Sequence, residues 1–342
     1  MKKSKYLILN SFYFDFNDEL TEILKVKKSF KNQNMLDLFK FDKIKIIKEN
    51  QFQFELLNFI YLPQNIKIIE ESAFGDNEIK ILDLSPYMSL KIIKKFSFEG
   101  NKIKELKLPQ NIEIIEKISF ASNTKIYSID LSQCKNLKNI NNAFKNIELN
   151  ILKISPYIET INESAFSLNQ IEILDLSQCE KLKTIDDHAF WHDQIKELKL
   201  PKNIEEINIS AFLDNEIKEL NLSQCINLKY IGGASFEANK IKKLYLPQNI
   251  EAIYPEAFLG NEIEVLDLSN CTNLKHIYRH AFTNNPLKEI KILSDVILEV
   301  LLSTNPDHYK DDIWNNFSYE YEHDRKAGTY KFEDGWWKWY PL

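Results

Sequence analysis

The sequence predicts a solenoid of the α/β class in which short parallel strands dominate. Four cysteines, each in the phrase Leu-Ser-x-Cys, recur at intervals of 45 or 46 residues, at Cys134, Cys179, Cys225 and Cys271. The phrase Leu-Pro-x-Asn falls about halfway between them, so the unit is about 23 residues long and has two alternating forms. A fixed period in this range is typical of solenoids, because each unit buries its apolar edge against its neighbours.

Each form contains one short apolar pattern. One form reads Ile-x-x-Leu-x-Leu-Pro over 195–201, and the other reads Ile-x-x-Leu-x-Leu-Ser over 171–177. Both match the leucine-rich repeat core, which gives one short strand and one turn per unit. The sequence therefore predicts a strand-dominated α/β leucine-rich repeat solenoid, with a parallel concave sheet of about 11–12 short strands and short helical or 3-10 turns on the convex side.

The first leucine of each pair, or an isoleucine in its place, marks the centre of a strand. Side chains alternate along a strand, so these residues should point inward and their neighbours outward. The expected centres are Ile60, Leu82, Leu106, Ile129, Leu152, Leu174, Leu198, Leu220, Leu244, Leu266 and Ile290. A degenerate unit is expected before them, around Ile44, Ile46, Ile47 and Phe52.

A second phrase, a small residue followed by Phe, recurs after the turn, as in Ala73-Phe74, Ala165-Phe166, Ala189-Phe190, Ala257-Phe258 and Ala281-Phe282. The small residue permits close approach of neighbouring turns, and the Phe is expected to fill the interior. An asparagine often follows, as at Asn77, Asn101, Asn215, Asn239 and Asn261.

This signature resembles the BspA-like leucine-rich repeat family over about residues 39 to 293. Family members commonly carry a cysteine after the Ala-Phe pair, whereas this chain carries asparagine. The resemblance implies a binding module more strongly than it implies a ligand, and many relatives are surface or secreted proteins implicated in adhesion.

The repeat divides the chain into three expected parts. Residues 1–38 form an N-terminal cap, 39–293 the solenoid of alternating 22- and 24-residue repeats, and 294–342 a C-terminal cap with an aromatic-rich hairpin. The alternative for the first segment is independent recruitment of a partner. A short helix is expected from Ser294 through Leu302.

The C-terminal hairpin is expected to turn at Asp334-Gly335, because Asp-Gly is the preferred type I′ turn. This register pairs Phe332 with Trp337 and Tyr330 with Trp339. The hairpin either caps the last turn or forms an aromatic platform for carbohydrate, peptide or another subunit. The platform would consist of Tyr330, Phe332, Trp336, Trp337 and Trp339.

Composition excludes several functional classes. A net charge of −6 argues against a large phosphate-binding surface, so no nucleic-acid partner is expected. No apolar run reaches membrane-spanning length. The segment after Met1 has no convincing export signal.

The cysteines are expected to be free. They occupy equivalent positions two turns apart, about 9–10 Å from one another, and this is too far for a disulfide. Each thiol should pack inside its turn and donate weakly to a backbone carbonyl. Unpaired thiols are typical of a reducing compartment, although buried thiols also persist outside the cell.

The residues between the paired leucines alternate Asp and Lys, which we interpret as cross-strand pairing. Asn221 and Tyr245 interrupt this alternation. We therefore expect a contact patch with Tyr245 as its anchor, because aromatic residues are enriched among binding hot spots. The patch comprises Glu197, Glu219, Asn221, Lys243, Tyr245 and Val265.

No catalytic residue, metal or cofactor is expected. The pairs His188/His192 and His276/His280 have helical ligand spacing, but each pair spans the Ala-Phe turn and lacks a third ligand. The chain has no Gly-rich phosphate loop. We do not expect an enzyme.

Two functions remain open. The first is a non-catalytic protein-protein interaction module, such as an intracellular scaffold or effector-like protein in the cytoplasm or a host cytoplasm. The second is a cell-surface adhesin or glycan-contacting protein. Self-association through the solenoid ends or the aromatic tail is also compatible with the sequence.

Overall fold

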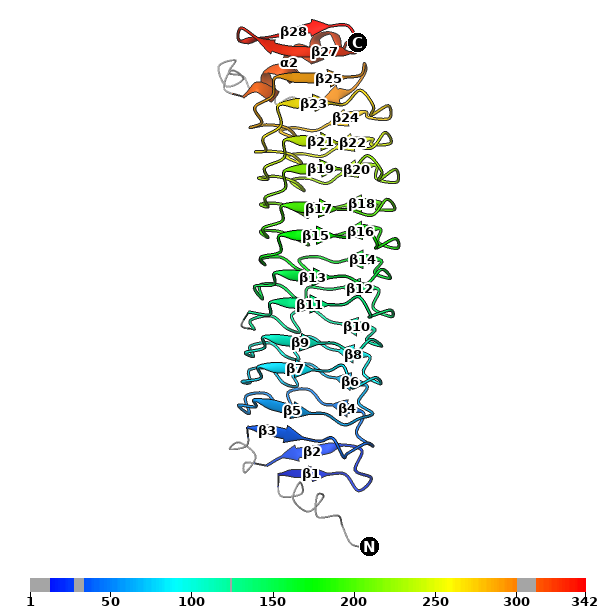
Figure 1. The fold of residues 1–342 in the computed structure, drawn as a ribbon, viewed down its shortest axis with the longest axis vertical. Helices are drawn as coiled ribbons and strands as arrows, with labels where there is room; N and C mark the ends of the chain where they lie inside the picture. Colours follow the sequence, from blue (N-terminus) through cyan, green and yellow to red (C-terminus); the bar gives the residue numbers. More distant parts are fainter. Residues whose placement is uncertain (1–12, 28–33, 124, 300–311) are drawn as a thin grey trace. The chain divides into compact units, whose positions relative to one another are not determined.

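The computed structural model describes residues 13–27, 34–123, 125–299 and 312–342. The chain divides into two compact units, Met1–Ile158 and Glu159–Leu342. Within each unit the backbone winds through repeated turns, and the turns contribute strands to two rows (Figure 1). The strand-dominated leucine-rich repeat solenoid is confirmed.

The first unit begins with an antiparallel pair of strands, β1 (Phe14–Phe16) and β2 (Ile23–Val26). The three-residue strands of its first row are β3 (Met35–Asp37), β5 (Phe59–Tyr61), β7 (Ile81–Asp83), β9 (Glu105–Lys107), β11 (Ser128–Asp130) and β13 (Ile151–Lys153). Its second row contains the two-residue strands β4 (Ile46–Ile47), β6 (Ile68–Ile69), β8 (Ile92–Ile93), β10 (Ile114–Ile115) and β12 (Asn139–Ile140).

The second unit continues the same two kinds of row. Its first row comprises β15 (Ile173–Asp175), β17 (Glu197–Lys199), β19 (Glu219–Asn221), β21 (Lys243–Tyr245), β23 (Val265–Asp267) and β25 (Glu289–Ile292). Its second row comprises β14 (Thr160–Ile161), β16 (Thr184–Ile185), β18 (Glu206–Ile207), β20 (Tyr230–Ile231), β22 (Ala252–Ile253), β24 (His276–Ile277) and β26 (Ile297–Leu298).

The expected strand centres are confirmed, because each lies in the middle of a first-row strand or, for Ile290, inside β25. The first row consists of hydrogen-bonded parallel pairs, such as β7 with β9 and β15 with β17. One strand lies outside the expected solenoid boundary, since β3 pairs in parallel with β5 and aligns Leu36 with Ile60. The strand row therefore starts at Met35, within the segment expected to be the N-terminal cap.

The segments between successive first-row strands differ in detail from the expected helical turns. Among the described residues they consist of the two-residue strands and the turns that follow them. Residues flanking the Ala-Phe pairs adopt the left-handed conformation, as His188 (φ 56°) and His192 (φ 55°) do. A left-handed residue cannot continue a right-handed helix, so these turns stay isolated.

A column of stacked phenylalanines fills the interior of each unit. Neighbouring rings lie 5.2–5.7 Å apart between centroids, with interplanar angles of at most 12°. The column contains Phe52, Phe74, Phe98, Phe120 and Phe144 in the first unit, and Phe166, Phe190, Phe212, Phe236, Phe258 and Phe282 in the second. The expectation that these rings fill the interior is confirmed.

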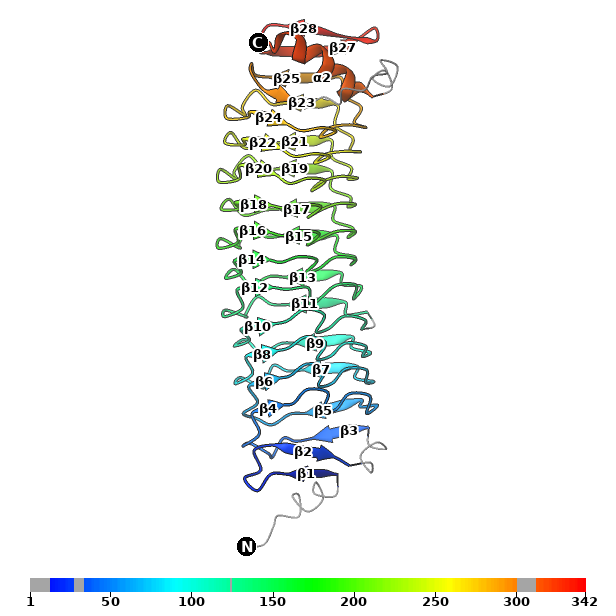
Figure 2. The ribbon, with the colours of Figure 1, turned by 180° about the vertical axis from the view of Figure 1, so that it is seen from behind.

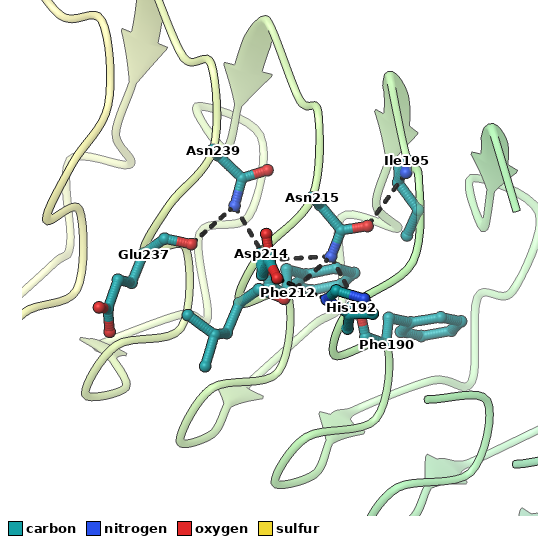
Figure 3. A network of polar contacts seen from close by, with 9 residues as sticks. Phe190, His192, Ile195, Phe212, Asp214, Asn215, Glu237 and Asn239 are labelled. Carbon is teal, nitrogen blue, oxygen red and sulfur yellow. Dashed lines mark hydrogen bonds and ion pairs between the residues drawn. The ribbon is translucent and has the colours of Figure 1, made fainter. Parts of the chain in front are cut away.

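A ladder of buried asparagines runs beside the phenylalanines (Figure 3). The amide nitrogen of Asn215 donates to the carbonyl oxygens of Phe190 (2.8 Å) and Phe212 (3.1 Å), and its oxygen accepts from the N–H of Ile195 (3.0 Å). Each asparagine thus satisfies backbone groups of two successive turns, which explains its burial. Sequence reasoning noted five members and missed Asn123, Asn169 and Asn285.

The ends of the chain cover this interior. In the first unit, Phe14 lies edge-on against Phe52 with 5.9 Å between ring centroids. In the second unit, α2 (Ile313–Asp324) and the hairpin of β27 (Gly328–Glu333) and β28 (Trp336–Tyr340) follow the last repeat. Figure 2 shows α2 beside β25 and the hairpin. Residues 1–12 and 28–33 of the expected N-terminal cap lie outside the described residues.

The helix expected from Ser294 through Leu302 is wrong in its described part. Asp295 is left-handed, and Ile297–Leu298 forms β26, which pairs in parallel with β24. The last turn has a free strand edge with backbone groups that can form hydrogen bonds. The N–H of Ile297 donates to the carbonyl of Lys275 on this edge at 2.8 Å, so the segment forms a strand. Residues 300–302 lie outside the described residues.

The expected hairpin is confirmed in register. Phe332 pairs with Trp337 and Tyr330 with Trp339. Asp334 and Gly335 have φ angles of 56° and 85°, as a type I′ turn requires. β27 also pairs antiparallel with β25, so the hairpin occupies the free edge of that strand.

Candidate functional site

The exposed side chains at the first and third positions of the three-residue strands form a surface that we call the strand face. The central residue of most of these strands is buried, while its neighbours are exposed. Short parallel strands hold these side chains on fixed backbone, so the strand face is a preorganised surface.

Acid–base pairs neutralise much of the strand face. Lys199 Nζ lies 3.4 Å from Asp175 and Lys291 Nζ 3.4 Å from Asp267, each across a hydrogen-bonded strand pair. The pairs Lys107–Asp83 and Lys153–Asp130 have distances of 3.8 and 3.6 Å. Exposed pairs of this kind contribute about 0–1 kcal/mol each.

The aspartates of these pairs also hold the turns that follow them. Asp175 Oδ1 accepts from the backbone N–H of Ser177 at 3.0 Å and from its hydroxyl at 2.6 Å. The hydroxyl bond lowers the pKa of Asp175, although partial burial opposes it. Asn221 makes the same two bonds to Ser223, at 3.0 and 2.7 Å. Asn221 therefore makes the same turn-forming hydrogen bonds as the aspartates but carries no negative charge.

The sequence-predicted patch lies on four neighbouring first-row strands of the second unit. The structure exposes all of its members, with Glu197 on β17, Glu219 and Asn221 on β19, Lys243 and Tyr245 on β21, and Val265 on β23. Lys243 Nζ lies 3.4 Å from Glu219. The charge pair of these two strands therefore occupies the first strand position, whereas the Asp–Lys pairs of neighbouring strands occupy the third. The neutral Asn221 and Tyr245 face each other across the same pair of strands.

A shallow depression adjoins this patch. Its volume is about 370 Å³, and Lys243, Tyr245 and Val265 line it together with Asp267 and Asn270. Glu197 lies outside this lining. The structure therefore brings three of the six predicted residues to one concavity and leaves the other three beside it.

The first unit carries an exposed apolar cluster that sequence reasoning missed. It comprises Met35, Phe39, Phe59, Tyr61 and Ile81, and we call it the apolar patch. Their side chains are 48–53% exposed, and Met35 pairs with Phe59 across β3 and β5. An alignment of the repeats could have revealed this patch. Polar residues such as Glu105 and Ser128 occupy the first strand position in other turns, where the patch has apolar residues.

The structure splits the predicted aromatic platform of the tail. Tyr330 is buried and Trp337 half-buried, and both rings lie 5.3 Å from Phe317 of α2. Phe332 is half-buried against Trp337. Only Trp336 and Trp339 of the five are exposed, at 67% and 45%. Two of the five platform residues therefore pack on α2, and a third packs on Trp337.

All four cysteines are free and buried, as expected. Cys134 Sγ lies 3.8 Å from the carbonyl oxygen of Pro109, and Cys225 Sγ lies 3.7 Å from that of Pro201. Burial raises the pKa of Cys134, Cys179 and Cys225 to about 11 and that of Cys271 to about 12. Such thiols carry almost no thiolate at neutral pH and are poor nucleophiles.

One buried carboxyl group interrupts the asparagine ladder. Asp193 occupies the position three residues after Phe190 where other turns carry asparagine. Its Oδ1 accepts from the N–H of Ile171 at 3.4 Å, and its Oδ2 is buried with no hydrogen-bond partner among the described residues. Burial raises the pKa of Asp193 well above the usual value, against the opposing effect of backbone N–H groups. Burial therefore disfavours the ionised form of this carboxyl group.

His188, His192 and His280 lie on the turns, and His276 begins β24. His192 Nδ1 lies 2.5 Å from Asp214 Oδ2 at the surface, and His280 Nδ1 lies 3.3 Å from the Thr283 hydroxyl. Within the four described ranges, no group of three or more His, Cys, Asp or Glu side chains could hold a metal ion. In the same ranges, no helix has the length and apolar character needed to cross a membrane.

The family model described as "BspA type Leucine rich repeat region (6 copies)" matches residues 45–172, 135–226 and 183–299. These ranges cover most of the chain. A search of curated proteins found no match.

Several solved structures resemble the fold. The LRIM1/APL1C complex matches with 13% identity over 84% of this chain, which spans 58% of that chain, and a TM-score of 0.47. The pneumococcal vaccine antigen PcpA matches with 16% identity over 80% of this chain and 77% of that chain, with a TM-score of 0.41. A leucine-rich repeat protein from Bacteroides ovatus matches with 17% identity over 84% and 76% of the two chains, with a TM-score of 0.39.

Proposed function

The chain belongs to the BspA-type leucine-rich repeat family, and we propose that it acts as a non-catalytic module that binds another protein through its strand face. The apolar patch of the first unit is the observation that carries this proposal. Five large apolar side chains remain about half exposed there. Met35 and Phe59 lie opposite each other on paired strands, and exposed apolar side chains grouped in this way mark interaction sites in soluble proteins.

The patch has the composition of a binding hot spot. Phe59 and Tyr61 are aromatic residues on one three-residue strand, and the side chain of Met35 can adapt to a partner's shape. The backbone beneath them is fixed by the parallel pairing of β3 and β5, so binding orders few additional groups. The strand face elsewhere presents acid–base pairs, which supply specificity more than affinity.

The Tyr245 depression is a second contact region under the same proposal. It combines one exposed aromatic residue with Val265 and the Lys243 ammonium group. It presents two exposed apolar side chains, Tyr245 and Val265, whereas the apolar patch presents five. We therefore assign it a supporting role in which Tyr245 anchors part of a partner.

Affinity capture from a lysate of cells that express the chain tests the proposal. The double variant Phe59→Ser/Tyr61→Ser should lose a specific protein that the unmodified chain retains. Ile173→Ser is the matched control, because Ile173 is 60% exposed at the first position of β15 in the second unit. If the double variant retains every specifically captured protein, the apolar patch is not the binding surface.

A glycan-contacting role would rest on Trp336 and Trp339. Removing residues 304–342 is a poor test of it, because α2 and its buried Trp314 would be lost as well. The variant Trp336→Ser/Trp339→Ser leaves Trp314, Tyr330 and Trp337 in place. A glycan array that responds to the unmodified chain and not to this variant would favour the adhesin function over the protein-binding module.

We further propose that the chain works inside a cell as a scaffold or effector-like protein. The four free thiols support this location, although their burial would also protect them at a cell surface. Cell fractionation with an antibody against the chain tests the location. Recovery in the surface fraction would instead support the adhesin alternative.

A further inference from the structure

The second unit carries a notch on its turn side, at Gly232 and Gly233 directly after β20. These residues are the one pair of adjacent glycines in the sequence. The same two positions hold Asn208-Ile209 in the preceding turn and Tyr254-Pro255 in the following turn. Two side chains are therefore missing from the row, and a concavity of about 760 Å³ lies there. This volume is within the range of small-ligand sites.

The backbone itself requires the first of these glycines. A Cβ atom added at Gly232 would lie 2.6 Å from the carbonyl oxygen of Ile207, a distance that real Cβ atoms do not adopt. At Gly233 the nearest atom is the carbonyl oxygen of Pro255, at 3.3 Å. The notch is thus built into the path of the chain and does not depend on a movable side chain.

Apolar and aromatic groups form the walls of the notch. The rings of Tyr230 and Tyr254 lie 6.1 Å apart between centroids at an angle of 58°, and both remain exposed. Tyr254 also stacks on Tyr278 with 5.1 Å between centroids, which fixes its orientation. Ile209 and Pro255 complete the apolar lining. The electron-rich faces of tyrosine attract cations.

Carboxylates form the rim of the notch, contributed by Asp187, Glu206, Glu237 and Glu256. Burial and the nearby Glu256 raise the pKa of Glu237. Figure 3 shows the Glu237 side chain extending away from the asparagine ladder. The site therefore combines tyrosine faces with negative charge that the described residues leave uncompensated.

We propose that the notch binds an arginine or lysine side chain presented by an extended segment of a partner protein. The ammonium or guanidinium group would lie between the tyrosine rings and the Glu237 and Glu256 carboxylates, and its aliphatic stem would contact Ile209 and Pro255. A neutral sugar could stack on the tyrosines but would leave the carboxylates unpaired. The inference goes beyond the proposed binding through the strand face, because the notch lies on the turn side and adds a separate contact with a protein partner.

The test uses the full chain with ¹³C-labelled isoleucine and alanine methyl groups. Ile209 and Ala234 line the notch and report on its occupancy. The probes are capped pentapeptides Gly-Gly-X-Gly-Gly in which X is arginine, lysine or citrulline. Citrulline has nearly the shape of arginine and carries no charge. We expect the arginine and lysine peptides to shift both methyl resonances saturably, and the citrulline peptide to bind at least about tenfold more weakly.

Glu237→Gln/Glu256→Gln should weaken the arginine peptide by about tenfold or more. Glu99→Gln is the matched control, because Glu99 follows Phe98 as Glu237 follows Phe236, and burial likewise raises its pKa. Gly233→Ile is a second variant that should occlude the notch with a residue found at the same position of the preceding turn. Its cooperative unfolding is checked first.

Three results would overturn the inference. These are equal binding of the citrulline and arginine peptides, unchanged arginine binding by the double glutamine variant, and methyl shifts caused only by a neutral oligosaccharide. Loss of notch binding would leave the proposed function intact if the apolar patch variants still lose a captured protein. Conversely, peptide binding at the notch would still support the inference if the apolar patch variants retained every captured protein.

Discussion

Trp314 packs on Phe282 with 4.9 Å between ring centroids and an angle of 56° between ring planes. The phenylalanine column of the second unit thus ends against a tryptophan from a helix outside the repeats. Phe317 lies 5.5 Å from Trp314 and continues the aromatic contact toward the hairpin. A repeat protein needs such end caps, because the last turn has no neighbour to bury its interior.

Trp314→Ala should destabilise the second unit by about 3–5 kcal/mol, the usual cost of removing a large buried aromatic side chain. Trp314 is 3% exposed, so the substitution leaves a cavity above Phe282. Hydrogen exchange should accelerate first in β24 and β26. Trp336→Ala is the control, because its side chain is 67% exposed and should change stability by less than about 0.5 kcal/mol. Equal urea midpoints for the two variants would contradict the capping role.

Asp193→Asn should stabilise the chain at neutral pH by about 1–3 kcal/mol, because it restores the donor that the ladder requires. The folded-state pKa of Asp193 is raised above its unfolded value. The stability associated with the protonated group is therefore fully present below the unfolded pKa and is lost as pH rises through the folded pKa. The difference between variant and unmodified chain should be smallest in acid and grow with pH, as measured by urea unfolding at several pH values.

Asn215→Asp supplies the reciprocal experiment. Asn215 is buried and donates to two phenylalanine carbonyl oxygens, which an ionised carboxylate cannot do. This variant should be less stable than the unmodified chain at neutral pH and recover in acid. If the stability of both the Asp193 and Asn215 variants varies with pH as that of the unmodified chain does, the residue at the ladder position does not determine how stability depends on pH.

The four cysteines should react with a thiol reagent only as the chain unfolds. Burial raises their pKa to about 11 or 12, so both access and thiolate content are low in the folded state. We expect slow labelling of the native chain at pH 8 and rapid labelling of all four thiols in denaturant. Rapid native labelling of any one of them would show that its turn opens locally.

The sequence predicted those features that the repeat period controls. Leu198 and Leu220 are buried strand centres because a strand that alternates one apolar and one polar residue has only one way to face the core. The hairpin register followed from Asp334-Gly335, since the type I′ turn fixes which residues are opposite. Both inferences depend on local rules that tertiary contacts reinforce.

Features that depend on which repeat positions stack were missed. The notch becomes apparent only when Gly232 and Gly233 are aligned with Tyr254-Pro255 of the next turn. α2 was missed although Trp314, Phe317 and Tyr321 have helical spacing, because aromatic density in this segment was interpreted only as a platform or cap. β26 was interpreted as a helix because a short apolar run does not distinguish the two structures, and the open edge of β24 decided the outcome.

Asn221→Asp/Tyr245→Lys should restore the Asp–Lys pair found on neighbouring strand pairs and remove the anchor of the Tyr245 depression. Asn221 already forms the turn that an aspartate forms elsewhere, and Tyr245 is 45% exposed, so stability should change by less than about 0.5 kcal/mol. Tyr245→Ala should weaken a partner bound there without altering cooperative unfolding. Asp175 faces Lys199 on the preceding strand pair, outside the lining of the depression, so Asp175→Asn/Lys199→Gln tests whether a change in a charge pair alone has the same effect. If a partner binds the unmodified chain and both Tyr245 variants with equal affinity, it does not contact Tyr245.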